Sequence, residues 1–183
     1  ADSWEISQDR HSVTFHLNKD AKWSDGTPVT AQDYVFAAQF VTNKENPASM
    51  KSRYQILQGV DKSGNADGSA PVGAEAVDDY TLKYTCKSPI DESDTFSVFM
   101  YDYIALPKHL LENTAPADYL TNQMWNAPVT NGPLAFDSMV PGSQLVMKAN
   151  KEYHMGAPSF DKFIIQVMAP SNMPSALIAG DID

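Results

Sequence analysis

The chain has 183 residues, of which 43% are hydrophobic and 20% are charged, and its formal net charge is -10. That length and apolar content suffice for one or two small domains with hydrophobic cores. The acidic balance argues against a nucleic-acid partner, because phosphate backbones attract basic patches and the 13 Lys and Arg residues are scattered. No stretch approaches the ~18 apolar residues of a membrane-spanning helix. No signal peptide is recognised at the start, and both ends are interpreted as cut from a longer chain.

Two short strands are expected within residues 4–17. In the second, Val13, Phe15 and Leu17 alternate with polar residues, which is typical of a half-buried strand. The following residues, 18–26, are polar and end in Asp-Gly, a strong turn signal. The pattern therefore predicts a strand that leads into a tight loop.

The clearest helix start in the sequence follows this loop. Thr30 is the predicted N-cap of a helix over residues 31–42, with Asp33 where a capping box usually has Glu or Gln. Val29 and Tyr34 are spaced to form a hydrophobic staple around the cap. A capped helix is therefore expected directly after the Asp-Gly turn.

The middle of the chain alternates loops with short elements. Residues 61–71 lack large apolar side chains and are expected to project into solvent. Residues 74–77 and 80–86 flank an Asp-Asp pair and predict a hairpin. Residues 92–111 predict a helix, an extended piece and a second helix opened by Pro107.

The last third is predicted to be mostly strand. After a polar stretch at residues 114–128, the pattern predicts a hairpin formed by residues 134–140 and 143–149. A further strand is predicted at residues 160–168, and a final helix at residues 172–179 with Ser171 as its cap. The mixture of hairpins and intervening helices predicts an α+β or mixed α/β fold rather than a doubly wound one.

The chemistry-bearing residues do not form a recognisable catalytic or metal-binding pattern. The four histidines lack a second His three or four residues on, so no metal site is predicted. Cys86 is the only cysteine and is interpreted as a small strand residue rather than a reactive thiol. Asp78 and Asp79 are interpreted as turn residues, since neighbours in a strand point to opposite faces. We therefore predict no enzymatic activity, no catalytic residue and no cofactor.

Five segments in order resemble family 5 of the bacterial extracellular solute-binding proteins, the oligopeptide- and dipeptide-binding group. Thr14–Val35 is similar to the strand, "KWSDGTPVTA" loop and helix of that family, and Ala76–Leu82 to its "ALDDYTL" hairpin. The remaining segments are Leu106–His109, Thr130–Tyr153 and Ala176–Asp183, the last like "AL.AGEID". Single motifs of this length are weak, but five in register cover nearly the whole chain.

The resemblance implies a fragment of a type II periplasmic-binding-protein-like fold. Such proteins close two lobes around a ligand, and this group carries an extra domain on the first lobe. Residues 1–107 would form most of the extra domain and residues 108–183 a returning segment of the first lobe, with the second lobe absent.

The resemblance also implies a function. The chain would belong to the substrate-binding component of an ABC importer, which captures oligopeptides at the periplasmic or extracellular face of the cytoplasmic membrane. Its partners would be an oligopeptide and the permease subunits, and the longer protein would be peripheral to the membrane or lipid-anchored. The alternatives are another solute of the same family, such as a nickel complex, an oligosaccharide or an opine, a hydrolase, and a domain that only contacts other proteins.

The ligand contacts implied by the resemblance lie after the capped helix. In the oligopeptide binders the extra domain contributes a Tyr from this segment, here residues 47–57. Tyr54 is the nearest match, and Met50 or Ser52 could equally occupy the position. The competing interpretation of Tyr54 is a buried core residue, because Tyr packs well in cores.

Overall fold

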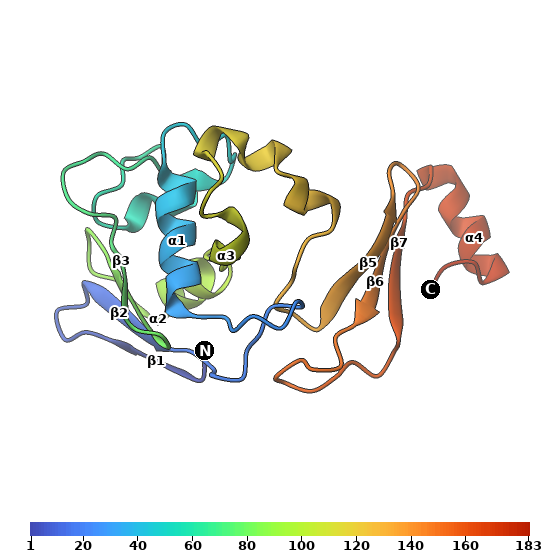
Figure 1. Cartoon of the computed structure of the whole chain (residues 1–183), viewed down its shortest axis with the longest axis horizontal. Helices are drawn as coiled ribbons and strands as arrows, with labels where there is room; N and C mark the ends of the chain where they lie inside the picture. The colour runs from blue at the N-terminus through green and yellow to red at the C-terminus, as the bar shows by residue number, and fades with distance from the viewer.

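The computed structural model describes all 183 residues and contains two antiparallel sheets (Figure 1). The first sheet has the strand order β1-β2-β4-β3, with β1 Ser3–Ile6, β2 Ser12–His16, β4 Thr81–Thr85 and β3 Ala74–Asp78. The second has the order β5-β6-β7, with β5 Leu134–Val140, β6 Gln144–Ala149 and β7 Lys162–Gln166. The mixed helix-and-sheet architecture confirms the predicted fold class, and all the predicted strands are present.

The first sheet packs against the helix α1 (Ala31–Thr42), as Figure 1 shows in blue and green. Val13 pairs with Tyr84 and Phe15 with Leu82 across β2 and β4. These side chains belong to a core cluster of 16 buried residues that also includes Val35 and Ala38 of α1. The alternation noted in the sequence is therefore the buried face of the central strand.

The start of α1 has the predicted cap. Thr30 is the N-cap, and its backbone N–H donates to Asp33 Oδ2 at 2.8 Å, so Asp takes the place of the usual Glu or Gln. The Thr30 side chain faces the Asp33 backbone N–H in return, which completes the capping box. Val29 is 3% exposed and packs with Trp23 in a cluster that Tyr34 also contacts, as expected of a staple.

The segment after the first sheet forms short turns of helix. α2 (Glu92–Asp94) continues into the π-helical turn η2 (Thr95–Met100), and an extended stretch leads to α3 (Lys108–Leu111). This order confirms the prediction for residues 92–111, with Pro107 at the N-cap rather than in the first turn.

α3 packs against α1. Leu106 and Leu111 form a buried cluster with Ala37 and Phe40 of α1, and Tyr119 contacts it from the next turn. This contact joins residues on both sides of position 107. The division into two parts, residues 1–107 and 108–183, stays a prediction.

The polar stretch at residues 114–128 is more regular than expected. It forms two 3-10 helices, η3 (Pro116–Thr121) and η4 (Gln123–Asn126). The Trp125 indole N–H donates to the Tyr119 carbonyl at 2.6 Å, and the two rings meet edge to face. Aromatic packing therefore stabilises helical turns that the polar composition of this segment does not predict.

The loop at residues 61–71 is exposed at residues 62–63, 67–69 and 71, as predicted, but part of it is held against the chain. The Ala66 N–H donates to the Thr42 carbonyl at the end of α1 at 2.8 Å. Gly64 is buried with a φ of +84°, and a Cβ there would lie 1.9 Å from the Lys51 carbonyl oxygen. The centre of the loop lies against the chain because its backbone, rather than large side chains, makes the contacts.

The chain ends with α4 (Met173–Ala179), the predicted last helix. The predicted cap at Ser171 is wrong, because Ser171 lies inside the 3-10 turn η5 (Pro170–Asn172) and Asn172 is the N-cap. None of the helices combines the length and apolar character needed to cross a membrane.

Candidate functional site

A depression of about 410 Å³ opens where the turn after α1 meets the extended segment before α3. It brings together two parts of the chain that are about fifty residues apart in sequence. Its lining residues are Val41, Ala48, Met50, Lys51, Arg53, Tyr54, Tyr101, Asp102, Ile104, Leu106 and Tyr119. Two of the three ligand contacts expected from the sequence, Met50 and Tyr54, are therefore on its wall.

The turn after α1 is held by hydrogen bonds to its own backbone. The Thr42 hydroxyl donates to the Ala38 carbonyl at 2.7 Å in the last turn of the helix. The Lys51 Nζ donates to the Asn46 carbonyl at 3.0 Å, which ties the turn to the 3-10 helix η1 (Lys51–Ile56). These bonds hold the backbone of the segment that carries Met50 and Tyr54.

Tyr54, on the wall of the depression, belongs to an aromatic stack. Tyr54 is 5% exposed, and its ring lies 4.3 Å from that of Tyr103 with an interplanar angle of 6°. Burial raises the pKa of both phenols above the ordinary value, so both stay neutral across the physiological pH range. Tyr54 therefore acts first as a core residue, as the competing interpretation held.

An ion pair lies at the edge of this stack. The Arg53 guanidinium donates to Asp102 Oδ2 at 2.5 Å, and the Arg53 side chain is 47% exposed whereas that of Asp102 is 6% exposed. The Tyr103 hydroxyl donates to the Arg53 carbonyl at 3.0 Å. These contacts fasten η1 to the extended segment and present one guanidinium face to solvent.

Large apolar side chains stand around the mouth. Met50 is 57% exposed, Tyr101 79% and Ile104 64%. These three apolar side chains lie beside a charged pair. Together they suit a ligand with an apolar group attached to a polar backbone. The lining contains no Ser, Thr, Cys or His.

Ser52 is exposed and does not line the depression. A 3-10 helix has about three residues per turn, so Lys51 and Tyr54 share one side while Ser52 faces away. The ligand contacts of Met50, Ser52 and Tyr54 stay predictions. Tyr101 and Ile104 were missed, although they belong to the apolar run that predicted the helix and extended piece.

The remaining chemistry-bearing residues have structural surroundings. Cys86 is 4% exposed, and burial raises the pKa of its thiol to about 12. His109 Nε2 lies 2.8 Å from Asp25 Oδ2, an ion pair between α3 and the strand-to-helix corner when the imidazole is charged. No group of three or more His, Cys, Asp or Glu is arranged to hold a metal ion.

The two antiparallel sheets with their intervening helices match part of a type II periplasmic binding protein, and solved members of this class match the chain along its whole length. The sequence model described as "Bacterial extracellular solute-binding proteins, family 5 Middle" matches residues 1–183. The chain therefore belongs to family 5 of the bacterial extracellular solute-binding proteins.

Relatives in sequence carry peptide-binding names. The periplasmic oligopeptide-binding protein OppA of Escherichia coli is 32% identical over 165 residues, which cover 84% of this chain and 28% of OppA. A putative ABC transporter peptide-binding protein of Brucella ovis is 30% identical over 185 residues, which cover 100% of this chain and 32% of that protein. The chain thus spans about a third of the length of these relatives.

Solved structures of several solute-binding proteins resemble the chain. NikZ from Campylobacter jejuni in complex with Ni(L-His) has a TM-score of 0.81 at 26% identity, over 100% of this chain and 33% of NikZ. The oligopeptide-binding protein OppAIV of Borrelia burgdorferi also has a TM-score of 0.81, at 27% identity, over 99% of this chain and 36% of that one. AppA of Bacillus subtilis, solved with a nonapeptide, has a TM-score of 0.83 at 24% identity and shows the shared fold; the match covers 100% of this chain and 33% of AppA.

Proposed function

We propose that this chain is part of the substrate-binding component of an ABC importer that captures oligopeptides outside the cytoplasmic membrane. The observation that carries the proposal is the family match over residues 1–183, together with relatives whose names specify peptide binding. The partners are an oligopeptide and the permease subunits of the importer. The protein acts at the periplasmic or extracellular face of the membrane, either peripheral to it or lipid-anchored.

The depression between η1 and the extended segment is the proposed contact with the peptide. A transporter must accept many sequences, so its side-chain pockets need apolar surface without a tight fit. Met50 and Ile104 supply flexible apolar contact, and the exposed guanidinium of Arg53 offers a donor to a peptide carbonyl or carboxylate. Tyr54 lines the same depression and is held by its stack on Tyr103.

The proposal assigns the chain to one lobe only. Residues 1–107 form most of the extra domain of the first lobe, and residues 108–183 form the returning segment of that lobe. A ligand held by one lobe keeps much of its surface in water and gains few of the polar contacts that would replace its hydration. The chain is therefore expected to bind peptides at millimolar rather than micromolar concentrations.

A second candidate function is the capture of a metal complex or an opine. It is favoured by the likeness to NikZ, solved with Ni(L-His), and to MoaA, solved with mannopinic acid, at 26% and 25% identity. Mass spectrometry of ligands that co-purify with the longer protein separates the candidates. A mixture of short peptides supports the peptide binder, and a histidine–nickel complex or a sugar–amino-acid conjugate supports the alternative.

The depression itself is tested by chemical-shift mapping with mixed tri- to pentapeptides at millimolar concentration. Peptide addition should shift the resonances of residues 50–54 and 101–104, and Met50→Ala should weaken these shifts. Met155→Ala is a matched control, because Met155 is 76% exposed and lies outside the depression. Equal effects of the two substitutions, or shifts confined to the second sheet, would remove the depression from the proposal.

A further inference from the structure

The depression between η1 and the extended segment differs in charge from the chain as a whole. The chain has a formal net charge of -10, with 23 Asp and Glu residues. Of these, only Asp102 lines the depression, together with two cations, Lys51 and Arg53. The phenols of Tyr54 and Tyr119 add no negative charge, because burial raises the pKa of each above its ordinary value. Two cations against one carboxylate leave the depression with a net positive charge on an acidic molecule.

The charge of Lys51 is not neutralised within the chain. Its Nζ donates only to backbone carbonyls, that of Asn46 at 3.0 Å and that of Asn43 at 3.4 Å. Neither of the two ion pairs in the structure includes Lys51. An ammonium carries three N–H donors, so one donor and the full positive charge are available to an anion that a ligand brings.

Arg53 uses only part of its donor capacity. A guanidinium carries five N–H donors, and the one hydrogen bond of the Arg53 side chain within the chain goes to Asp102. Asp102 is the buried member of this pair, whereas about half of the Arg53 side chain is exposed. The remaining N–H groups suit a second carboxylate, which a guanidinium can bind through two parallel hydrogen bonds.

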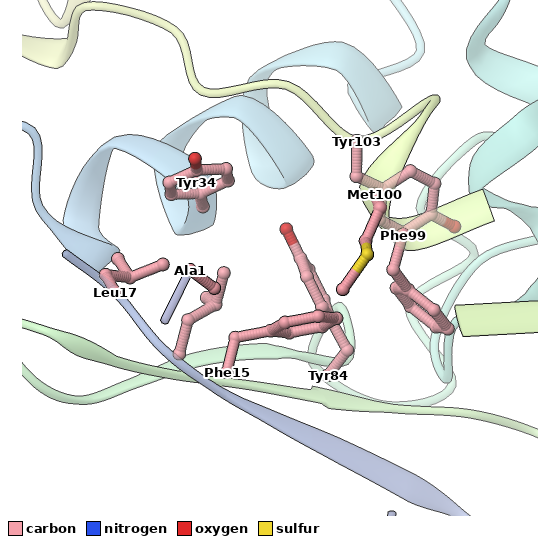
Figure 2. Close-up of a pocket in the computed structure, with 9 residues that line it drawn as sticks. Ala1, Phe15, Leu17, Tyr34, Tyr84, Phe99, Met100 and Tyr103 are labelled. Atoms are coloured by element: carbon pink, nitrogen blue, oxygen red, sulfur yellow. The ribbon is translucent and has the colours of Figure 1, made fainter. Parts of the chain in front are cut away.

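The ion pair is attached to the aromatic core. Tyr103 follows Asp102 directly, and its ring meets those of Phe99 and Tyr84 edge to face, at 5.1 Å and 5.3 Å between centroids (Figure 2). The Tyr103 hydroxyl also donates to the Arg53 carbonyl at 3.0 Å. The backbone on both sides of the pair is thus held before a ligand arrives, which lowers the ordering cost of binding.

We propose that the depression selects peptides that present a carboxylate to it, with Arg53 and Lys51 as the binding groups. This inference rests on the proposed function, since it requires that the depression contact the peptide. The carboxylate can belong to an Asp or Glu side chain or to the peptide C-terminus. The exposed Met50 and Ile104 can contact the methylene groups of an acidic side chain, which makes that side chain the favoured source.

The test is a chemical-shift titration of the chain with the tripeptides Ala-Glu-Ala, Ala-Gln-Ala and Ala-Lys-Ala, each with an amidated C-terminus. The Glu peptide should bind about two- to fivefold more tightly than the Gln peptide, the effect of a partly exposed ion pair, and the Lys peptide should bind least. Added salt should reduce this preference. The net charge of the whole chain would favour the opposite order, so the expected preference cannot arise from non-specific attraction. Ala-Gln-Ala with a free C-terminus measures the contribution of the terminal carboxylate.

Two variants remove the binding groups separately. Lys51→Gln removes the ammonium, and the double variant Arg53→Gln with Asp102→Asn removes the guanidinium without leaving a buried carboxylate unpaired. Each should reduce the preference for a carboxylate to less than half of its original value. Lys62→Gln is the matched control, because Lys62 is exposed, lies outside the depression and changes the net charge equally. Thermal melts establish that the variants are folded, and either of the two is informative without the other.

The inference is overturned if the Glu and Gln peptides bind equally and the free C-terminus gives no gain over the amide. Shifts at residues 50–54 and 101–104 would in that case still support peptide capture by the depression. A carboxylate preference that survives both variants would also overturn the inference, since the anion would then bind elsewhere. If no peptide shifts these residues, the depression loses its place in the proposed function as well, so the two failures are distinguishable.

Discussion

The side chain of Asp33 connects the start of α1 to the backbone of Lys108 at the start of α3. Its Oδ2 accepts from the Thr30 N–H at 2.8 Å, and its Oδ1 accepts from the Lys108 N–H at 3.1 Å. Asp33 is only 5% exposed. One carboxylate therefore satisfies an N–H at the start of each of two helices, and its bond to Lys108 spans 75 residues of the chain.

Replacement of Asp33 by Asn is expected to destabilise the fold by about 1.5–3 kcal/mol, the range for hydrogen bonds to a charged group. The amide keeps one acceptor oxygen but turns a donor toward one of the two N–H groups. Thr30→Ala should cost about 1 kcal/mol or less, because the Thr30 hydroxyl makes only a 3.4 Å contact to Asp33. Urea unfolding measures both, with the exposed Asp20→Asn as the control. A larger effect for Thr30→Ala would contradict this assignment.

Gly64 and Gly68 provide a matched pair in the loop at residues 61–71. Both have positive φ, +84° and +77°, but a Cβ at Gly64 would lie 1.9 Å from the Lys51 carbonyl oxygen whereas one at Gly68 meets nothing within 4 Å. Gly68→Ala should cost about 1–2 kcal/mol from left-handed strain alone. Gly64→Ala should cost clearly more, since the backbone of η1 must also move. Thermal unfolding measures both variants. Equal unfolding midpoints for Gly64→Ala and Gly68→Ala would show that the loop is not held against η1.

The pH dependence of stability should include a contribution from Asp25. Burial by itself raises the pKa of Asp25, but hydrogen bonds from the Thr27 backbone N–H and the His109 ring outweigh it and place that pKa below its ordinary value. A folded-state pKa below the unfolded value of about 3.9 stabilises the fold above about pH 4, and this stabilisation is lost as the pH falls through the folded pKa.

The destabilisation caused by Asp25→Asn should therefore be full at pH 5 and should shrink as the pH falls from about 4 towards 3. Urea midpoints measured at half-unit intervals of pH test this dependence, with Asp20→Asn again as the control. A destabilisation that grows on acidification would reverse the expected sign and would contradict the lowered pKa.

The elements that were predicted correctly depend on contacts close in sequence. The cap at Thr30 needs only Asp33, three residues on, and the alternation of Val13 and Phe15 requires only that one face of the strand be buried. The family motifs likewise correspond to strand, turn and cap signals. Such local patterns are visible without knowledge of the tertiary fold.

The depression depends on contacts that no local pattern reveals. The Arg53–Asp102 ion pair and the Tyr54–Tyr103 stack both join residues 49 apart, so their partners are known only after the chain has folded. Ser52 faces away from the depression because η1 is a 3-10 helix. The composition of the segment does not distinguish a 3-10 helix from an α-helix, so this placement could not be predicted. The helical turns at residues 116–126 depend on the contact of Tyr119 with Trp125 in the same way.

Tyr54 and Met50 line the same depression but are expected to respond to substitution in opposite ways. Tyr54 is 5% exposed and stacked on Tyr103, so Tyr54→Ala should destabilise the fold by about 3–5 kcal/mol, the cost of removing a buried aromatic ring. Met50 is 57% exposed, and Met50→Ala should stay within about 0.5 kcal/mol. Tyr54→Phe keeps the stack and removes a hydroxyl that has no hydrogen-bond partner in the chain, so it should be nearly neutral. Denaturant unfolding of the three variants measures these differences. A small effect of Tyr54→Ala would mean that the ring is free to serve a ligand, and a large effect of Met50→Ala would mean that its role is structural.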